Sequence, residues 1–145
     1  MKFKCISLSL VFIGILSGCS NLLPEPKPPR ATITIQKQTY ETKMGSYCWE
    51  SSSKGVCADT AGPVELLKNE TSISVNPNEN LHIQIKGNPK LTESHLTQIQ
   101  KKKEQNVPVQ NGMFTAPKNE GSYMYAYSIR TENGDVFYAF SLTVK

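Results

Sequence analysis

The sequence predicts an all-β domain over residues 31–145, an antiparallel β-sandwich of about seven to nine strands. The first observation is periodicity: apolar residues recur mainly at every second position, as in strands with one face on a core and the other in water. The second is the spacing of turn-forming residues, which separate the short alternating runs from one another. The third is the scarcity of helix signals outside residues 62–69.

Residues 122–144 give the clearest element, a long antiparallel hairpin. Apolar residues alternate with smaller or polar ones from Tyr123 to Ile129 and again from Val136 to Val144. Asn133-Gly134 lies between the two runs, and this pair takes the positive φ values of a type I′ turn. The sequence therefore places the turn of this hairpin at Asn-Gly.

The remaining elements are shorter. Residues 62–69 are expected to form one or two helical turns, because Pro63 suits a first helical position. Residues 91–103 fit either period, and only the β character of the surrounding chain favours a strand there. Further strands are expected at residues 32–40, 45–50, 72–75, 81–85, 107–109 and 113–115.

One short run indicates which kind of sandwich to expect. Asn119-Glu120-Gly121-Ser122-Tyr123-Met124-Tyr125 resembles the D-x-G-x-Y-x-C run that opens strand F of immunoglobulin domains. The resemblance implies an immunoglobulin-like fold, with Tyr123 as a corner tyrosine whose hydroxyl bonds to backbone upstream. Asn119 replaces the usual Asp, and Tyr125 stands where that family has its second cysteine. The resemblance is limited to this corner and concerns fold, not function.

The first 19 residues form an export signal. Lys2 and Lys4 precede an apolar run from Ile6 to Leu16, which is about half the roughly 20 residues that a membrane-spanning helix needs. Leu16-Ser17-Gly18-Cys19 resembles the lipobox of bacterial lipoproteins. That resemblance implies cleavage of residues 1–18, a lipid on Cys19, and attachment to the outer side of the cell membrane, or to the outer membrane in a Gram-negative host. A plain signal peptide or a short membrane anchor is the alternative.

Cleavage would leave 127 residues, beginning with a proline-rich tether over residues 19–30 that holds four of the nine prolines. Lys2 and Lys4 leave with the signal, so 14 basic and 12 acidic side chains remain, a balance of +2. The charge of the whole chain is thus partly a targeting feature. We expect no nucleic-acid partner.

Cys48 and Cys57 are the cysteines left in the predicted domain. In an exported chain, two cysteines nine positions apart favour a structural disulfide. A zinc site would need two further ligands, and His82 and His95 lie far away in sequence. A redox-active pair is the other alternative, although the spacing is not C-x-x-C.

Trp49 adjoins this pair, and Lys54 lies in the loop between the two cysteines. Two interpretations are open: Trp49 packs in the core on the disulfide, or Trp49 and Lys54 form a displayed, stapled binding loop. The Tyr-Cys-Trp and Cys-Ala-Asp-Thr runs are also similar to small lipoproteins of bacilli with no assigned activity. That similarity spans residues 44–144 and implies location and fold without chemistry.

We expect no catalytic residue, metal site or cofactor, because the sequence has no G-x-S-x-G elbow, P-loop, H-E-x-x-H motif or EF-hand loop. Both histidines are expected at the surface. The expected role is a lipid-anchored, non-enzymatic binding or accessory module for an envelope protein or a wall polymer. An envelope hydrolase or thiol-redox enzyme is the alternative from a different class.

Overall fold

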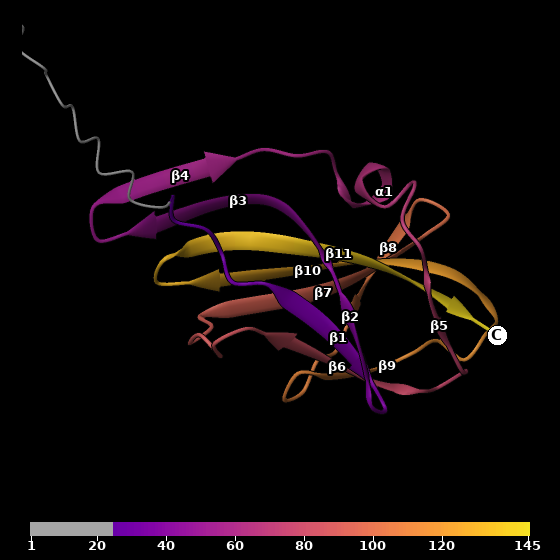
Figure 1. The fold of residues 1–145 in the computed structure, drawn as a ribbon. Helices are drawn as coiled ribbons and strands as arrows, with labels where there is room; N and C mark the ends of the chain where they lie inside the picture. Colours follow the sequence, from indigo (N-terminus) through magenta and orange to yellow (C-terminus); the bar gives the residue numbers. More distant parts are fainter. Residues whose placement is uncertain (1–24) are drawn as a thin grey trace, which may run out of the picture.

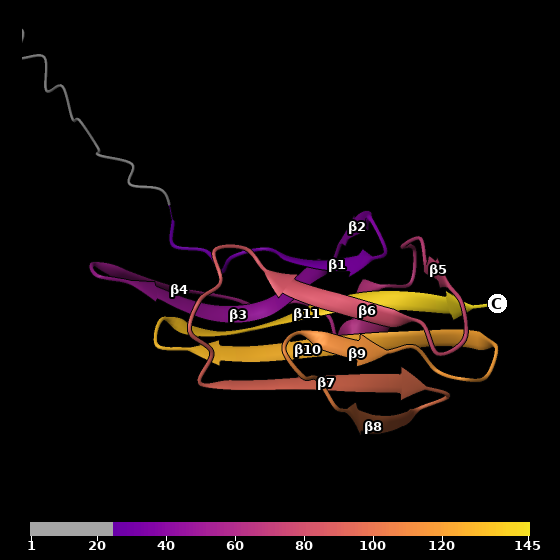
Figure 2. The ribbon, with the colours of Figure 1, turned by 90° about the horizontal axis from the view of Figure 1, so that it is seen from below.

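The computed structural model describes residues 25–145, and Cys19 with the predicted signal lies outside them. The described chain folds into two packed β-sheets with one short helix (Figures 1 and 2). The elements are β1 (Ala31–Ile35), β2 (Gln38–Glu41), β3 (Lys43–Ser51), β4 (Lys54–Ala58), α1 (Pro63–Leu66), β5 (Ile73–Val75), β6 (Asn80–Ile85), β7 (Glu93–Gln100), β8 (Lys103–Val107), β9 (Met113–Thr115), β10 (Gly121–Thr131) and β11 (Gly134–Val144).

The smaller sheet has the order β2-β1-β6-β9, and the larger has the order β4-β3-β11-β10-β7-β8. The short strand β5 adds to the larger sheet, parallel to the end of β11, while the other pairings are antiparallel. Figure 1 shows the larger sheet above the smaller one, and in Figure 2 the smaller sheet lies in front of the larger one. The all-β sandwich is therefore confirmed, and α1 occurs within residues 62–69, where one or two helical turns were expected.

The order of the later strands gives the immunoglobulin-like arrangement. The chain passes from β6 in one sheet to β7 and β8 in the other, returns to β9 beside β6, and ends in the β10–β11 hairpin. Two earlier hairpins extend this arrangement: β1–β2 adds to β6, and β3–β4 adds to β11. These additions explain why residues 25–145 form eleven strands where about seven to nine were expected.

The structure also has more strands than expected because two of its tight turns contain residues that rarely occur in such turns. Residues 32–40 were expected to form one strand but contain β1, β2 and a turn where Gln36 has a φ of 54°. The β7–β8 turn is formed by Lys101 and Lys102, with φ values of 47° and 65°. Non-glycine residues seldom adopt positive φ, so Gln36 in the first turn and Lys101-Lys102 in the second do not indicate a turn in the sequence. Residues 91–103 contain a strand, as favoured.

The β10–β11 hairpin is confirmed over its whole length, with Gly121 opposite Val144 and Thr131 opposite Gly134. The position of its turn was predicted wrongly, because the two-residue loop is Glu132-Asn133 and Gly134 belongs to the strand. Gly134 has a φ of 141°, and a Cβ built on it would lie 2.0 Å from the carbonyl oxygen of Cys48. This glycine therefore permits close approach of β3.

The corner tyrosine is confirmed. Tyr123 is buried, and its hydroxyl donates a 2.9 Å hydrogen bond to the carbonyl oxygen of Asn119. The next inward residue on β10, Tyr125, stacks on Phe140 with ring centroids 5.0 Å apart, and Phe114 from the smaller sheet lies 5.8 Å from Tyr125. These aromatic rings join the two sheets at the centre of the core.

The proline-rich segment is part of the fold at its C-terminal end, which corrects the predicted tether boundary at Arg30. Pro28 is buried, and the Pro29 carbonyl accepts a 2.6 Å hydrogen bond from the Tyr138 hydroxyl. The Arg30 carbonyl accepts a hydrogen bond from the backbone N–H of Lys86. Composition suggested a tether because proline lacks an amide donor, but the carbonyl groups of this segment still bond to the domain.

Within residues 25–145, no helix is long and apolar enough to cross a membrane.

Candidate binding face around the disulfide

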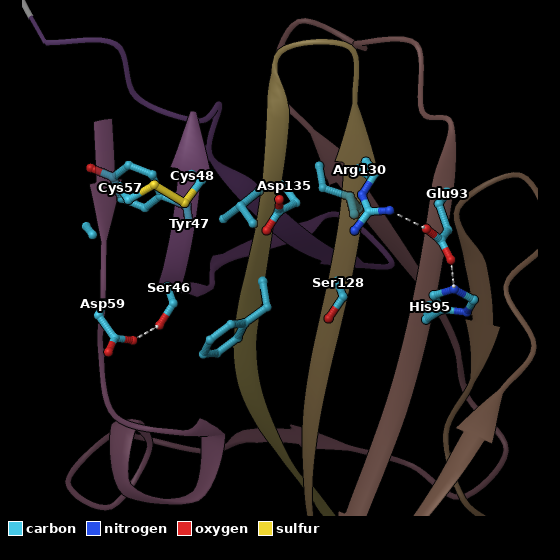
Figure 3. Close-up of a pocket in the computed structure, with 14 residues that line it drawn as sticks. Ser46, Tyr47, Cys48, Cys57, Asp59, Glu93, His95, Ser128, Arg130 and Asp135 are labelled. Atoms are coloured by element: carbon cyan, nitrogen blue, oxygen red, sulfur yellow. Dashed lines mark hydrogen bonds and ion pairs between the residues drawn. A yellow bond between two sulfur atoms is a disulfide. The ribbon is translucent and has the colours of Figure 1, made fainter. Parts of the chain in front are cut away.

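The outward surface of the larger sheet carries two parallel rows of side chains, which we call the disulfide face (Figure 3). Strand register aligns the first row across five strands, and the second row lies one pleat away. The first row is Cys57, Cys48, Asp135, Arg130 and Glu93. The second row is Asp59, Ser46, Phe137, Ser128 and His95.

A β-bulge shapes this face. Val136 pairs with Tyr47 and Tyr138 pairs with Met44, so Phe137 faces two residues of β3, Gly45 and Ser46. The Phe137 ring lies over Gly45, where an added Cβ would come within 2.0 Å of the ring. A bulge bends its strand and increases local twist, which fits the concave form of the face.

The resulting concavity has a volume of about 570 Å³ and is open to solvent. Its lining includes both rows. The half-buried Phe137 ring and the disulfide form an apolar floor, and polar side chains surround them. Helix α1 packs against β3, β10 and β11 at the other end of the sheet. No described element covers the two rows, so this part of the sheet can meet a partner.

The disulfide joins directly opposed residues of β3 and β4, with the Cα atoms 4.0 Å apart. The predicted pairing of Cys48 with Cys57 is therefore confirmed. Asp135 is the residue opposite Cys48 on β11. A carboxylate beside a cysteine disfavours the thiolate form, which would be the attacking species in thiol exchange. This environment suits a structural disulfide better than a redox-active one.

The two ends of the face differ in charge. At the β7 end, Glu93 accepts a 2.8 Å hydrogen bond from His95 and forms an ion pair with Arg130 at 3.5 Å. The hydrogen bond from His95, together with the charge of Arg130, lowers the pKa of Glu93 below its usual value. At the β4 end, Asp59 accepts a 2.8 Å hydrogen bond from the Ser46 hydroxyl.

The arrangement of His95 bears on the hydrolase alternative. Ser128 lies directly opposite His95 across β10 and β7, and Glu93 contacts the ring, so the three residue types of a triad are neighbours. No hydrogen bond joins Ser128 to His95 in the described part of the chain, and Figure 3 shows the Ser128 hydroxyl turned away from the ring. The nucleophile is therefore not activated by this histidine in the structure.

Metal binding has little support among residues 25–145, where no three His, Cys, Asp or Glu side chains are grouped to hold an ion. Glu93 and His95 make a pair without a third ligand. Structural and catalytic metal sites use three or four protein ligands. The face is better suited to recognition by surface contact than to metal chemistry.

The structure separates the two residues predicted as a binding loop. Trp49 is only 9% exposed and belongs to the core, because strand alternation turns it inward while Cys48 turns outward. It is thus neither displayed nor on the disulfide's side of the sheet. Lys54 is exposed at the β3–β4 hairpin and forms an ion pair with Glu25 at 3.3 Å. Neither residue lines the concavity.

Sequence reasoning missed most of the disulfide face. Asp135, Arg130 and Glu93 come from three strands and meet only through register, which a single sequence does not specify. The available signal was alternation: in the β10–β11 hairpin, the outward side carries Ser128, Arg130, Asp135 and Phe137. Phe137 was the informative residue, being an aromatic ring on the solvent face.

No known protein-family model matches this chain, and no curated protein matches it in sequence.

Proposed function

We propose that this chain is an exported lipoprotein, anchored through Cys19, that acts in the cell envelope as a non-enzymatic binding or accessory module. Its partner is an envelope protein or a wall polymer. The observation that supports binding is the disulfide face: a concave, uncovered part of the sheet with an apolar floor and charged borders.

The support for this face is its rigidity. Its side chains stand on five hydrogen-bonded strands, and the disulfide fixes the outermost pair. A surface held in place before binding loses little conformational entropy when a partner docks. Hydrogen bonds from Ser46 to Asp59 and from His95 to Glu93 restrict polar side chains in the same way.

The lipid anchor and the fold together suggest how the domain stands on its membrane. The buried Pro28 lies nine positions after Cys19, so a fully extended chain could span at most about 30 Å between them, at roughly 3.3 Å per residue. Glu25 contacts Lys54 at the tip of the β3–β4 hairpin. The chain therefore enters the domain beside this hairpin, and a lipid on Cys19 would keep the disulfide face within reach of the bilayer surface.

The anchor is tested by fractionating cells that express Cys19→Ala. Loss of the lipid label and retention of the uncleaved mass are expected, because the lipid and the cleavage both require the cysteine. Cys5→Ala is the matched control, since Cys5 would be removed with the signal. Unchanged membrane association and unchanged mature mass of Cys19→Ala would refute the lipid assignment.

The binding role is tested by comparing two charged substitutions after crosslinking in cells. Ser128→Arg places a bulky cation at the centre of the disulfide face, whereas Gln84→Arg places it on the exposed surface of the smaller sheet. Loss of a specific crosslinked partner from Ser128→Arg alone is expected. Retention of that partner would place recognition elsewhere, and turnover of an envelope substrate by the purified protein would refute the non-enzymatic role.

A further inference from the structure

The acidic end of the disulfide face has carboxylates that the rest of the face does not neutralise. Arg130 and His95 both contact Glu93 on β7, and Arg130 also lies opposite Asp135 in the strand register without forming an ion pair with it. Asp59 and Asp135 make no ion pair within residues 25–145, and the hydrogen bond to Asp59 comes from a neutral serine. Two negative charges therefore border the same concavity, Asp59 directly after β4 and Asp135 on β11.

The floor between these carboxylates is apolar. The Phe137 ring lies over Gly45, and the disulfide crosses from β3 to β4 one pleat away. An aliphatic stem can lie on such a surface while a charge at its end reaches a border carboxylate. A cation near the Phe137 ring would also be attracted by the negative face of its π system.

Asp59 is held in position by a short chain of hydrogen bonds. The backbone N–H of Thr60 donates to the Ser46 hydroxyl at 2.9 Å, and this hydroxyl donates to Asp59 at 2.8 Å. The Ser46 hydroxyl therefore uses its proton in the hydrogen bond to Asp59. The carboxylate of Asp59 has further lone pairs, which remain open to solvent. A carboxylate fixed in this way is ready to accept a donor from a bound cation.

Resting on the proposed binding function, we propose that the acidic end of the disulfide face receives a lysine or arginine side chain of a protein partner. Its charged head meets Asp59 or Asp135, and its stem lies over Phe137 and the disulfide. Charge complementarity selects this occupant, because an anionic group would be repelled by both carboxylates and a neutral sugar would leave them unpaired.

The test is an NMR titration of the purified domain with N-acetyl-arginine N-methylamide. The control ligand is the corresponding citrulline amide, which has nearly the same shape without the charge. Arginine amide is expected to shift the backbone amides of Cys48, Asp135 and Phe137 with a dissociation constant on the order of 1–10 mM, which is typical of one side chain. Sodium chloride at about 0.5 M should weaken this binding several-fold.

The variant for the test is the double substitution Asp59→Asn and Asp135→Asn, which keeps size and removes both charges. Glu104→Gln on β8, outside the concavity, is the matched control. The double variant should bind arginine amide at least fivefold more weakly, while Glu104→Gln binds as the parent does. Equal shifts from citrulline, unchanged affinity of the double variant, or no shift at all would overturn the inference.

The crosslinked partner separates this inference from the function on which it rests. Loss of the partner from both Ser128→Arg and the double variant supports both proposals. If Ser128→Arg loses the partner and the double variant keeps it fully, the proposal that a basic side chain binds here is wrong. The proposal that the disulfide face binds a partner would remain supported. Retention by both variants would overturn the binding face itself.

Discussion

The Tyr138 hydroxyl donates a 2.6 Å hydrogen bond to the Pro29 carbonyl, joining the last strand of the domain to the proline-rich segment 109 positions earlier. Tyr138 is fully buried and Pro29 is half-buried, so the strand shields this carbonyl in part. The contact sets where the folded domain begins. It also predicts that the domain needs residues before Ala31 for full stability.

Tyr138→Phe should lower the free energy of unfolding by about 1 to 2 kcal/mol, because the Pro29 carbonyl loses its donor in a place that water reaches poorly. Urea denaturation followed by circular dichroism measures the change. Tyr40→Phe is the control, since Tyr40 is only half-buried and its hydroxyl bonds to the exposed Gln38. An equal loss in both variants would mean that the hydrogen bond to Pro29 contributes no more to the free energy of unfolding than an exposed one does.

Tyr123→Phe should cost about 1 kcal/mol or more for the same reason, since the Asn119 carbonyl loses the corner hydrogen bond. The loss is expected as a lower thermal midpoint with an unchanged far-ultraviolet spectrum. A melting curve identical to that of the parent would show that the corner hydrogen bond does not stabilise the domain. It would not contradict the β-sandwich fold.

High pH should destabilise the domain through its buried tyrosines. Burial raises the pKa of Tyr125 and of Tyr138 above the ordinary value, so the folded state favours their neutral forms. This contribution is complete below the unfolded pKa of about 10 and is lost as the pH rises above it. Urea midpoints should therefore fall as the pH rises above about 10, and less steeply for Tyr125→Phe. A flat profile would contradict the burial of these hydroxyls.

Reduction of the disulfide should lower the free energy of unfolding by at most about 3 kcal/mol, the chain-entropy value for a ring of about ten residues. The reduced protein should stay folded, because Cys48 and Cys57 lie on the outer face, apart from the core. Denaturation with and without reductant measures this difference, and alkylation of the unreduced, denatured protein should label neither cysteine. Complete unfolding on reduction would show that the β3–β4 hairpin carries far more of the stability.

The sequence predicted those features that depend on local pattern. The β10–β11 hairpin followed from alternation, and Tyr123 followed from a seven-residue run. The Lys101-Lys102 turn could not be predicted, because two lysines adopt a backbone conformation that usually belongs to glycine or asparagine.

The disulfide face depends on long-range information. Glu93 and Asp135 are 42 positions apart and meet through Arg130 only because β10 pairs with both β7 and β11. The burial of Trp49 follows from the register of β3, where Gly134 lies opposite it. Proximity to the cysteines in sequence suggested that Trp49 joins them, whereas strand alternation places it on the opposite side.

Site-specific photo-crosslinking in cells tests the central claim, that the disulfide face contacts a partner in the envelope. A photoreactive amino acid is placed at Ser128 in the face and, as control, at Gln84 on the smaller sheet. The account predicts one defined adduct from position 128, competed by unlabelled wild-type domain, and none from position 84. A defined adduct from position 84 with none from position 128 would contradict it.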